Sequence, residues 1–211
     1  TVFLLDWEYV SGEDVLQGRP EFKNNVVQGD GAVQVVASGP DTQQGIMSDF
    51  YYSLITNATK SIWIASPYFV PNQAIKAAIK HAAIKGIQVR VMVPAVNDGF
   101  LTQYGSRSYF GELLQFGVEV YLYKKGFLHQ KLIIVDGDMA SIGTANMDMR
   151  SFHLNFEVNV FLMGSRTIED LITHYKEDMM DSDKLDPIGY NNRGLLERSK
   201  ESFARLFSNV L

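Results

Sequence analysis

Short β-rich runs alternate with longer helical segments along most of this chain, and this alternation limits its fold more than any other feature. Seven runs rich in β-branched and aromatic residues are expected to form strands: residues 32–38, 61–66, 87–94, 118–123, 128–136, 139–143 and 156–162. Four segments with helical periodicity separate many of them: residues 43–59, 72–86, 101–117 and 166–180. The sequence therefore predicts an α/β fold with a mixed, largely parallel sheet flanked by helices on both faces.

Local signals support the predicted helix at 72–86. Asn72 follows Pro71 and can cap the first turn with its side chain, and Gly86 can end the helix before the next strand. A helix between two β-rich runs, with a start and a stop signal at its ends, is the pattern of a βαβ unit.

The final stretch, residues 193–211, also has the pattern of an amphipathic helix. Its apolar residues recur at helical spacing: Leu195, Leu196, Phe203, Leu206 and Phe207. We expect this helix to pack its apolar face against the domain rather than to anchor the chain in a membrane.

The N-terminal part of the chain is expected to be separate from the main domain. Residues 17–32 are rich in turn formers and polar side chains, which favours a linker. The preceding residues 1–10 are too acidic and too short for a signal peptide with a basic start, so they read as the continuation of an upstream segment. No apolar run approaches the roughly 20 residues that a transmembrane helix needs.

Charge and composition exclude several classes of site. The chain has 19 Lys and Arg against 24 Asp and Glu, a net charge of −5, so no broad basic surface for nucleic acid is expected. Cysteine is absent, which excludes disulfides and every cysteine-based metal or nucleophilic site. An anionic ligand would have to be bound by a few local side chains.

The stretch at 127–146, FLHQKLIIVDGDMASIGTAN, carries the chemistry. If residues 128–136 form a strand, His129 and Lys131 project from the same face and can reach one oxyanion. A nucleophile or base would then stand beside a fixed positive charge. Asp136 has the opposite parity along the strand, so the geometry does not define its role.

Four further positions suit phosphate chemistry. Gly143 permits a close approach of the backbone, and Thr144 and Asn146 supply hydrogen-bonding side chains. Glu157 could accept a proton from the imidazole and fix its tautomer. From ordinary residue frequencies, the pattern His-x-Lys-x4-Asp-x6-Gly-Thr-x-Asn would arise by chance in a chain of this length on the order of once in a million.

At these residues the sequence resembles the phospholipase D superfamily, whose signature is His-x-Lys-x4-Asp followed by Gly-Ser/Thr-x-Asn. The segments at 66–75, 143–159 and 205–211 are similar to the C-terminal half of bacterial cardiolipin synthases, and the leading residues 3–13 are similar to the end of the N-terminal half in that family. This resemblance implies that residues 1–32 are a remnant of the preceding half-domain with a linker, and that residues 33–211 form the C-terminal phospholipase D-like catalytic domain.

The resemblance also implies an activity, the transfer of a phosphatidyl group between two phosphatidylglycerol molecules with release of glycerol, through a phosphohistidine. Neither a metal nor a cofactor is required. The roles carried over are a catalytic group at His129, phosphate ligands at Lys131 and Asn146, a supporting hydroxyl at Thr144, an imidazole-orienting carboxylate at Glu157, and the motif acid at Asp136. For Asp136, counted with the catalytic motif, the opposite parity favours a structural role or a role behind the ligands.

The implied partners are phosphatidylglycerol, the N-terminal half of the same polypeptide with the second motif, and a membrane surface contacted by the full-length protein. The implied location is the bacterial cell membrane, and nucleic acid is not an expected partner. Two alternatives stay open. One is a phospholipase D-type phosphodiesterase or endonuclease that completes its site by homodimerisation. The other is a chain that folds but is inactive by itself.

Several residues outside the motif are assigned by their context. We expect His81 and His174 to lie on solvated helix faces, whereas His153 is a candidate for lining the substrate entrance. Tyr68 and Phe69 follow a strand end, where ligands often bind, although hydrophobic packing is the more common use of such side chains.

Overall fold

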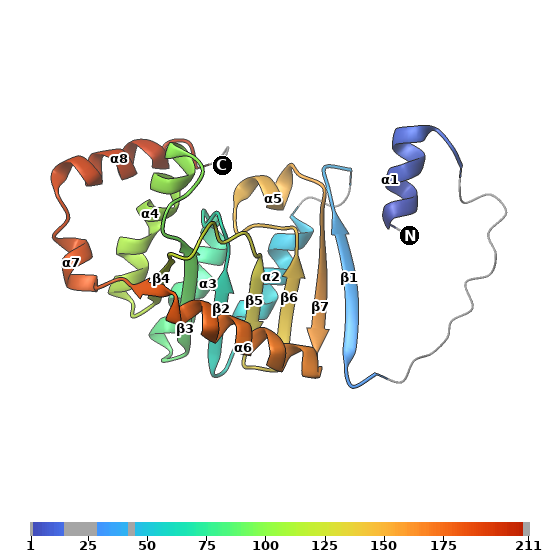
Figure 1. Cartoon of the computed structure of the whole chain (residues 1–211), viewed down its shortest axis with the longest axis horizontal. Helices are drawn as coiled ribbons and strands as arrows, with labels where there is room; N and C mark the ends of the chain where they lie inside the picture. The colour runs from blue at the N-terminus through green and yellow to red at the C-terminus, as the bar shows by residue number, and fades with distance from the viewer. Residues whose placement is uncertain (1, 15–28, 42–44, 209–211) are drawn as a thin grey trace.

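The computed structural model describes residues 2–14, 29–41 and 45–208. Within these residues, eight strands form one sheet (Figure 1). The order of the strands across the sheet is β1-β7-β6-β5-β2-β3-β4-β8. The strands are β1 (Ala32–Ser38), β2 (Ser61–Ala65), β3 (Gln88–Pro94), β4 (Glu119–Tyr123), β5 (Leu132–Val135), β6 (Met139–Gly143), β7 (Glu157–Met163) and β8 (Ser182–Lys184).

The mixed α/β sheet is confirmed, but the prediction of largely parallel pairing is wrong. Strand β3 pairs in parallel with β2 and with β4, whereas the other five neighbouring pairs are antiparallel. The parallel pairs are the ones joined by long helical crossovers. Only three residues, 136–138, join β5 to β6, and so short a connection requires an antiparallel hairpin.

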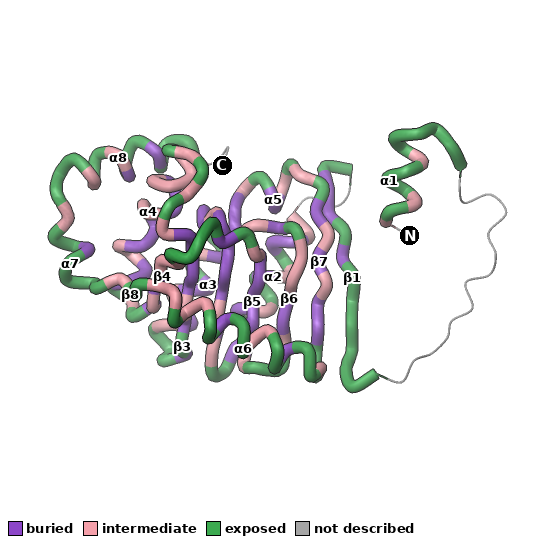
Figure 2. Tube along the Cα trace, viewed as in Figure 1, coloured by how far each residue is buried: buried purple, intermediate pink, exposed green. Residues whose placement is uncertain are grey.

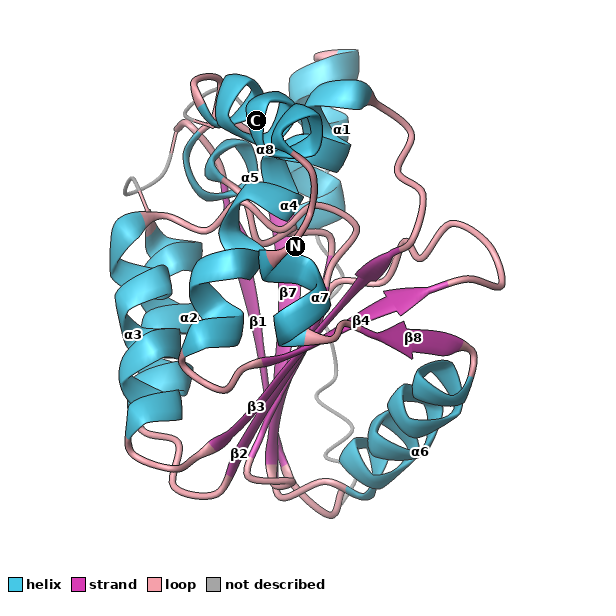
Figure 3. Ribbon diagram, turned by 90° about the vertical axis from the view of Figure 1, so that its left-hand side faces the viewer, coloured by secondary structure: helices cyan, strands magenta, loops and turns pink. Residues whose placement is uncertain are grey.

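Helices cover both faces of the sheet, as expected (Figure 3). The helices α2, α3 and α4 lie on one face, and α6 lies on the other. The helices are α1 (Val2–Ser11), α2 (Ile46–Thr56), α3 (Gln73–Ile84), α4 (Phe100–Gln115), α5 (Met149–His153), α6 (Arg166–Met180), α7 (Pro187–Asn191) and α8 (Leu195–Arg205).

Strand β5 lies in the centre of the sheet and is buried on both sides. Ile133 and Val135 pack into the core under α2, α3 and α4, whereas Leu132 and Ile134 pack into the core under α6. Successive side chains of a strand point to opposite faces, so a strand covered on both sides becomes apolar at every position. The run Leu-Ile-Ile-Val is thus explained by its place between two cores, and it fixes the position of the motif residues at either end.

Most helix predictions are confirmed to within a few residues. The side chain of Asn72 accepts a hydrogen bond from the Ile75 amide and caps α3, and Gly86 follows that helix with a positive φ of 83°. The segment at 166–180 forms α6 with the same bounds. The sequence interpretation did not include the short elements α5, α7 and β8.

The C-terminal helix forms, but it packs through the other face. Glu201 and Ala204 are the buried residues of α8, and the five apolar residues expected to pack against the domain are exposed. Salt bridges explain the reversal, because Arg107 and Arg193 both bind Glu201 and hold this face against α4. Residues 209–211 lie outside the described residues.

The N-terminal helix α1 has no buried residue, and much of its length is exposed in Figure 2. Residues 17–28, most of the predicted linker at 17–32, lie outside the described residues. The next strand, β1, pairs along its whole length with β7. A division of the chain at residue 32 stays a prediction. None of the helices within the described residues is long and apolar enough to cross a membrane.

Candidate functional site

His129 and Lys131 lie in the loop that leads into β5, not on a strand as the sequence predicted. Strand β2 ends at Ala65, which pairs with Leu132, so the residues before Leu132 have no partner strand on that side. Only a hydrogen bond of 3.4 Å from the Gly143 amide to the Lys131 carbonyl extends the pairing with β6. His129 therefore lies just before the N-terminal end of the central strand β5, with its side chain exposed.

Lys131 is a nearly buried cation directly beside His129. The residue is only 8% exposed, and its Nζ donates a hydrogen bond of 2.7 Å to the His129 carbonyl. Burial lowers the pKa of Lys131, while the carboxylates of Glu157 and Asp148 act in the opposite direction. The amine is thus fixed on the backbone of His129 and near two acids.

The loop after β6 carries the Gly-Thr-x-Asn part of the motif and is tied closely to β7. A Cβ at Gly143 would collide with the Val158 carbonyl and with Asn159, so only glycine fits there. The Thr144 hydroxyl accepts a hydrogen bond of 2.9 Å from the Val158 amide, and the Thr144 amide donates one of 3.0 Å to the Val158 carbonyl. The hydroxyl of Thr144 therefore positions the loop.

A buried polar network supports this loop from below, and the sequence interpretation did not include it. Asn159, which has no exposed surface, accepts a hydrogen bond of 3.1 Å from the Ala145 amide and donates to the hydroxyls of Tyr51 and Ser141. The Tyr51 hydroxyl in turn donates to the Ala145 carbonyl. The sequence signal for this network was an asparagine within an apolar strand. Asn159 lies two residues after Glu157, so both side chains point to the same face of β7.

Asn146 and Asp148 lie at the end of this loop. The Asn146 amide donates a hydrogen bond of 3.0 Å to the Ser151 hydroxyl, and its side-chain Oδ1 is buried with no hydrogen-bond partner among the described residues. Asp148 is 3% exposed and caps α5 by accepting from the Ser151 amide. Burial raises the pKa of Asp148 against the hydrogen bonds from Ser151 and Asn146. The sequence signal for Asp148 was the capping pattern Asp-x-x-Ser.

Glu157 starts β7 and is 8% exposed. Its carboxylate accepts a hydrogen bond of 3.2 Å from the Asn155 side chain, and its charge acts on Lys131 and on Asp148. The orientation of the His129 imidazole by Glu157 stays a prediction.

Asp136 lies at the other end of β5, away from the residues above. Its carboxylate accepts hydrogen bonds from the amides of Thr59, Lys60 and Ser61 and from the Thr59 hydroxyl, at 2.7–2.8 Å. Burial alone would raise the pKa of Asp136, but these hydrogen bonds outweigh it and lower the pKa. The structure therefore does not bring Asp136 into the cluster, and the carboxylate fastens the β5–β6 turn to the start of β2.

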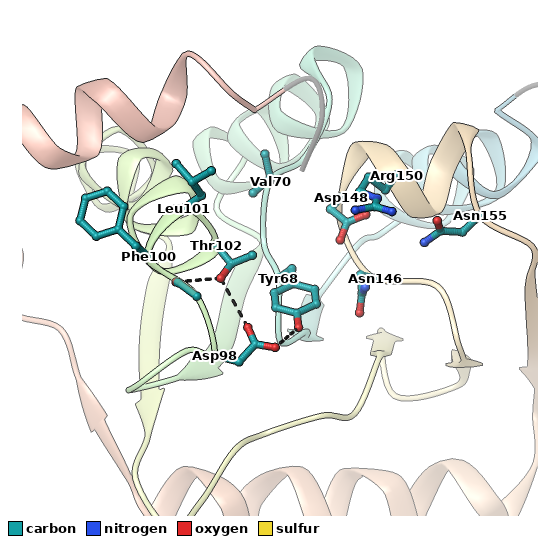
Figure 4. A pocket seen from close by; sticks show the side chains of 11 residues that line it. Tyr68, Val70, Asp98, Phe100, Leu101, Thr102, Asn146, Asp148, Arg150 and Asn155 are labelled. Atoms are coloured by element: carbon teal, nitrogen blue, oxygen red, sulfur yellow. Dashed lines mark hydrogen bonds between the residues drawn. The ribbon is translucent and has the colours of Figure 1, made fainter.

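A cavity of about 550 Å³ opens beside the cluster, between the start of α4 and the region of α5 (Figure 4). Its wall combines apolar side chains with amides and charged groups: Tyr68, Val70, Asp98, Gly99, Phe100, Leu101, Thr102, Asn146, Asp148, Arg150 and Asn155. The Tyr68 hydroxyl donates a hydrogen bond of 2.6 Å to Asp98, and burial raises the pKa of Tyr68 to about 12. A polar head with an apolar extension matches this wall.

Aromatic rings connect this cavity to His129. The ring of Tyr68 lies 6.5 Å from that of Phe127, which lies 5.7 Å from the imidazole of His129. Phe69 is fully buried, so it serves packing. Tyr68 thus lines the cavity, whereas its neighbour Phe69 belongs to the core.

The other histidines lie elsewhere. His81 is exposed on α3, and His174 is exposed on α6 beside Glu177. His153 ends α5, faces Gly45, and does not line the cavity described above. All four histidines of the chain fall within the described residues, and only His129 belongs to the cluster.

Comparisons with known sequences agree on one family. The family model described as "Cardiolipin synthase, PLD-like domain" matches residues 51–179, a span that includes every residue of the cluster. Over its whole length the chain is 61% identical to "Probable cardiolipin synthase YwiE" of Bacillus subtilis and 47% identical to "Cardiolipin synthase" of Geobacillus thermodenitrificans. The chain spans 42% of the length of each of these relatives.

Solved structures with the same fold are more distant in sequence. Nuc of Salmonella typhimurium, a phospholipase D family member, aligns with a TM-score of 0.63 at 20% identity over 74% of this chain and 98% of its own. Phosphatidylserine synthase of Haemophilus influenzae aligns with a TM-score of 0.66 at 16% identity over 84% of this chain and 45% of its own. At these identities the likeness concerns the fold.

Proposed function

Because the chain belongs to the family of phospholipase D-like domains of cardiolipin synthases, we propose that it supplies one histidine-containing half of a cardiolipin synthase active site. The complete enzyme transfers a phosphatidyl group from one phosphatidylglycerol molecule to another and releases glycerol. The observation that carries this proposal is the cluster itself. An exposed imidazole, a nearly buried ammonium group and the Asn146 side-chain amide lie in the two loops at one end of β5 and β6.

The chemistry requires two imidazoles. The first attacks the phosphorus of one phosphatidylglycerol to form a phosphatidyl-histidine, and the second, protonated, gives its proton to the departing glycerol oxygen. A hydroxyl group of the second phosphatidylglycerol then passes its proton to the second imidazole, attacks the phosphorus and releases the first histidine. Imidazole suits both roles near neutral pH. We assign His129 to the second role, general acid and then general base.

Lys131 and Asn146 would bind the non-bridging phosphate oxygens. A fixed, poorly hydrated cation stabilises charge that develops in the transition state more strongly than a mobile surface lysine does. The low exposure of Lys131 and its hydrogen bond to the His129 carbonyl support this role, because they fix the ammonium group against the loop that carries the imidazole.

The supporting residues have different roles in this proposal. Thr144 fixes the loop that carries Asn146, because its hydroxyl is bonded to β7. Glu157 orients the imidazole, and Asp136 acts at a distance by holding the β5–β6 turn. Residues 33–211 would form the catalytic domain, preceded by a remnant of the other half and a linker.

The second imidazole is proposed to come from another half-site. The relatives are more than twice as long as this chain, which leaves room for a second motif in the same polypeptide. That other half, phosphatidylglycerol and a membrane surface are the proposed partners, and the bacterial cell membrane is the proposed location.

The test is analysis of the lipid products of the polypeptide that carries this chain, with and without His129→Ala. We expect the rate of cardiolipin formation from phosphatidylglycerol to fall by at least a thousandfold in the variant, because removal of a catalytic group generally has an effect of this size. His153→Ala is the matched control, because His153 is a histidine outside the cluster, and it should retain activity. Undiminished cardiolipin formation by His129→Ala would overturn the proposal, and phosphatidic acid as the main product would indicate a hydrolase.

A second candidate follows from the single histidine in the cluster. Two copies of the chain could pair their His129 side chains across a two-fold axis and act as a phosphodiesterase or endonuclease. Sedimentation analysis of the purified chain with a soluble phosphodiester assay distinguishes the two. An active dimer would favour this candidate, whereas a monomer without activity would favour the two-half enzyme.

A further inference from the structure

Helix α8 is attached to the domain through its polar face. Arg193 binds the Glu201 carboxylate through Nε and Nη2, and the Tyr190 hydroxyl donates to the same carboxylate at 2.9 Å. Ala204 is fully buried on this side of the helix. An ion pair and a small residue therefore make the contact that hydrophobic residues usually make.

The opposite face of α8 and of the turn after it is apolar and open to solvent. The exposed fractions are 80% for Leu195, 71% for Leu196, 52% for Phe203, 78% for Leu206 and 38% for Phe207. With a rotation of roughly 100° per residue, these five positions fall within an arc of about 120°. We call this set the α8 apolar face. Glu201 and Ala204 lie on the other side of the helix.

Basic side chains border the α8 apolar face. On the same helical projection, Lys200 lies at one edge, and Arg198 and Arg205 lie beyond the other. Residues 193–208 hold four basic and two acidic residues, a local charge of +2, whereas the whole chain carries −5. One of the two acids, Glu201, is buried in its ion pairs. Because Arg193 pairs with Glu201 and Lys200 with Glu197, the excess positive charge beside the α8 apolar face comes from Arg198 and Arg205, in an otherwise acidic molecule.

The α8 apolar face also lies next to the cavity beside His129. Lys200 donates a hydrogen bond of 3.2 Å to the Tyr104 hydroxyl, and the Tyr104 ring lies 4.7 Å from that of Phe100. Phe100 and Leu101 belong to the cavity wall, as Figure 4 shows, and Phe100 is 52% exposed. Lys200, at one edge of the α8 apolar face, is thus linked through Tyr104 to Phe100 in the cavity wall.

We propose that the α8 apolar face docks on the surface of an anionic phospholipid bilayer, with the helix in the plane of the interface. An apolar face bordered by lysine and arginine fits this partner, because the apolar side chains enter the acyl boundary while the cations meet anionic head groups. The inference rests on the proposed function, which supplies an anionic lipid as substrate. Docking here would hold the cavity next to the head groups.

The experiment is co-sedimentation of the purified chain with vesicles of phosphatidylcholine alone or mixed with phosphatidylglycerol. We expect binding to the mixed vesicles, at least tenfold weaker binding to phosphatidylcholine, and a further loss in high salt. The double variant Leu196→Ser with Phe203→Ser should bind mixed vesicles at least tenfold more weakly than the parent chain. Arg198→Glu should weaken binding severalfold at low salt and less at high salt.

The matched control is Tyr52→Ser with Ile84→Ser, which removes two exposed apolar side chains from α2 and α3. This variant should bind as the parent chain does. Circular dichroism should show that every variant is folded, because all the substituted side chains are on the surface.

Three results would overturn the inference. They are equal binding to both kinds of vesicle, binding that the double α8 variant retains, and a dimer of the chain that the double α8 variant converts to a monomer. The last would make the face an interface between copies. His129→Ala separates docking from chemistry, because it should abolish cardiolipin formation by the longer polypeptide and leave vesicle binding by this chain unchanged.

Discussion

The two ends of β5 belong to one sequence motif but differ in every physical respect. Before the strand, His129 is exposed, and Lys131 is nearly buried with its amine on the His129 carbonyl. After the strand, Asp136 has its carboxylate occupied by Thr59, Lys60 and Ser61. At the first end an imidazole is free to react, whereas at the second end the carboxylate accepts hydrogen bonds from backbone amides.

This difference shows that a motif can join chemistry and architecture in a few residues. The four apolar residues of β5 connect the two ends through the middle of both cores. A displacement of the β5–β6 turn would therefore move the loop that holds His129. The acid is required for the position of the site although it takes no part in the reaction that we propose.

Among the residues that act beside the His129 imidazole, the largest effect is expected from Lys131→Met, which tests the reactive end of β5. Removal of a group that stabilises transition-state charge typically costs about 10²–10³ in rate, so cardiolipin formation by the full polypeptide should fall by roughly that factor. Burial lowers the pKa of Lys131, so the folded state holds the charged amine at a cost, and thermal stability should hold or rise when methionine replaces it.

The control for this prediction is Lys125→Met, at an exposed lysine whose side chain pairs with Asp181. It should retain its rate. A loss of stability in Lys131→Met with an unchanged rate in the folded protein would reverse the comparison between the two ends.

Asp136→Ala tests the architectural end. It removes four hydrogen bonds and puts alanine at a φ of 56°, a region that aspartate and asparagine tolerate better. We expect a loss of about 3 kcal/mol in the free energy of unfolding, measured by urea denaturation. At a temperature where the variant is folded, its activity should stay within about tenfold of the parent.

Asp138→Ala, at an exposed aspartate in the same turn, is the control and should unfold within about 0.5 kcal/mol of the parent chain. A thousandfold loss of activity in fully folded Asp136→Ala would contradict the structural role.

The pH dependence of stability separates the ends further. The pKa of Asp136 is lowered in the folded state. Its ionised carboxylate therefore contributes fully to the free energy of unfolding at pH values above its pKa in the unfolded state, which is about 4. This contribution is lost as the pH falls from there through the folded-state pKa. Asp136→Asn keeps a residue that tolerates the positive φ but removes the charge, so it should unfold at lower denaturant concentration than the parent at pH 7, with a smaller difference at pH 3. An equal difference at both pH values would show that the charge has no part in holding the turn.

The smallest effect is expected from Thr144→Val, between the two ends. The variant keeps the shape of the side chain but removes the acceptor for the Val158 amide, which should cost about 1 kcal/mol in the free energy of unfolding. Activity should fall severalfold, because the loop that carries Asn146 is held less firmly. A drop as large as that of Lys131→Met would instead indicate direct contact between the Thr144 hydroxyl and the phosphate.

The positions of the regular elements could be predicted from the sequence where their signals are local. Helix α6 has the predicted bounds, and strands β1 and β6 also match. Side-chain period and capping act over a few residues, so they can be read without knowledge of the rest of the fold. The short elements α5, α7 and β8 have too few residues for a period to emerge.

The cluster could be predicted in part. His129, Lys131 and Asn146 were found by the motif, whereas Asp148 and Asn159 were not. These two act through burial and through hydrogen bonds to loops that are distant along the chain, such as the bond from Asn159 to Tyr51. Such partners have no fixed spacing in the sequence.

The sequence by itself determined which longer segments become helices and strands and which residues can carry phosphate chemistry, because both depend on residue type and near neighbours. Only the tertiary structure decided that most strands pair antiparallel, that the carboxylate of Asp136 binds the amides of residues 59–61, and that α8 turns its leucines and phenylalanines to solvent. These outcomes depend on which elements meet. The ion pairs from Glu201 to Arg107 and Arg193 outweigh the periodicity of the helix, since they bury one face of it and leave the other open.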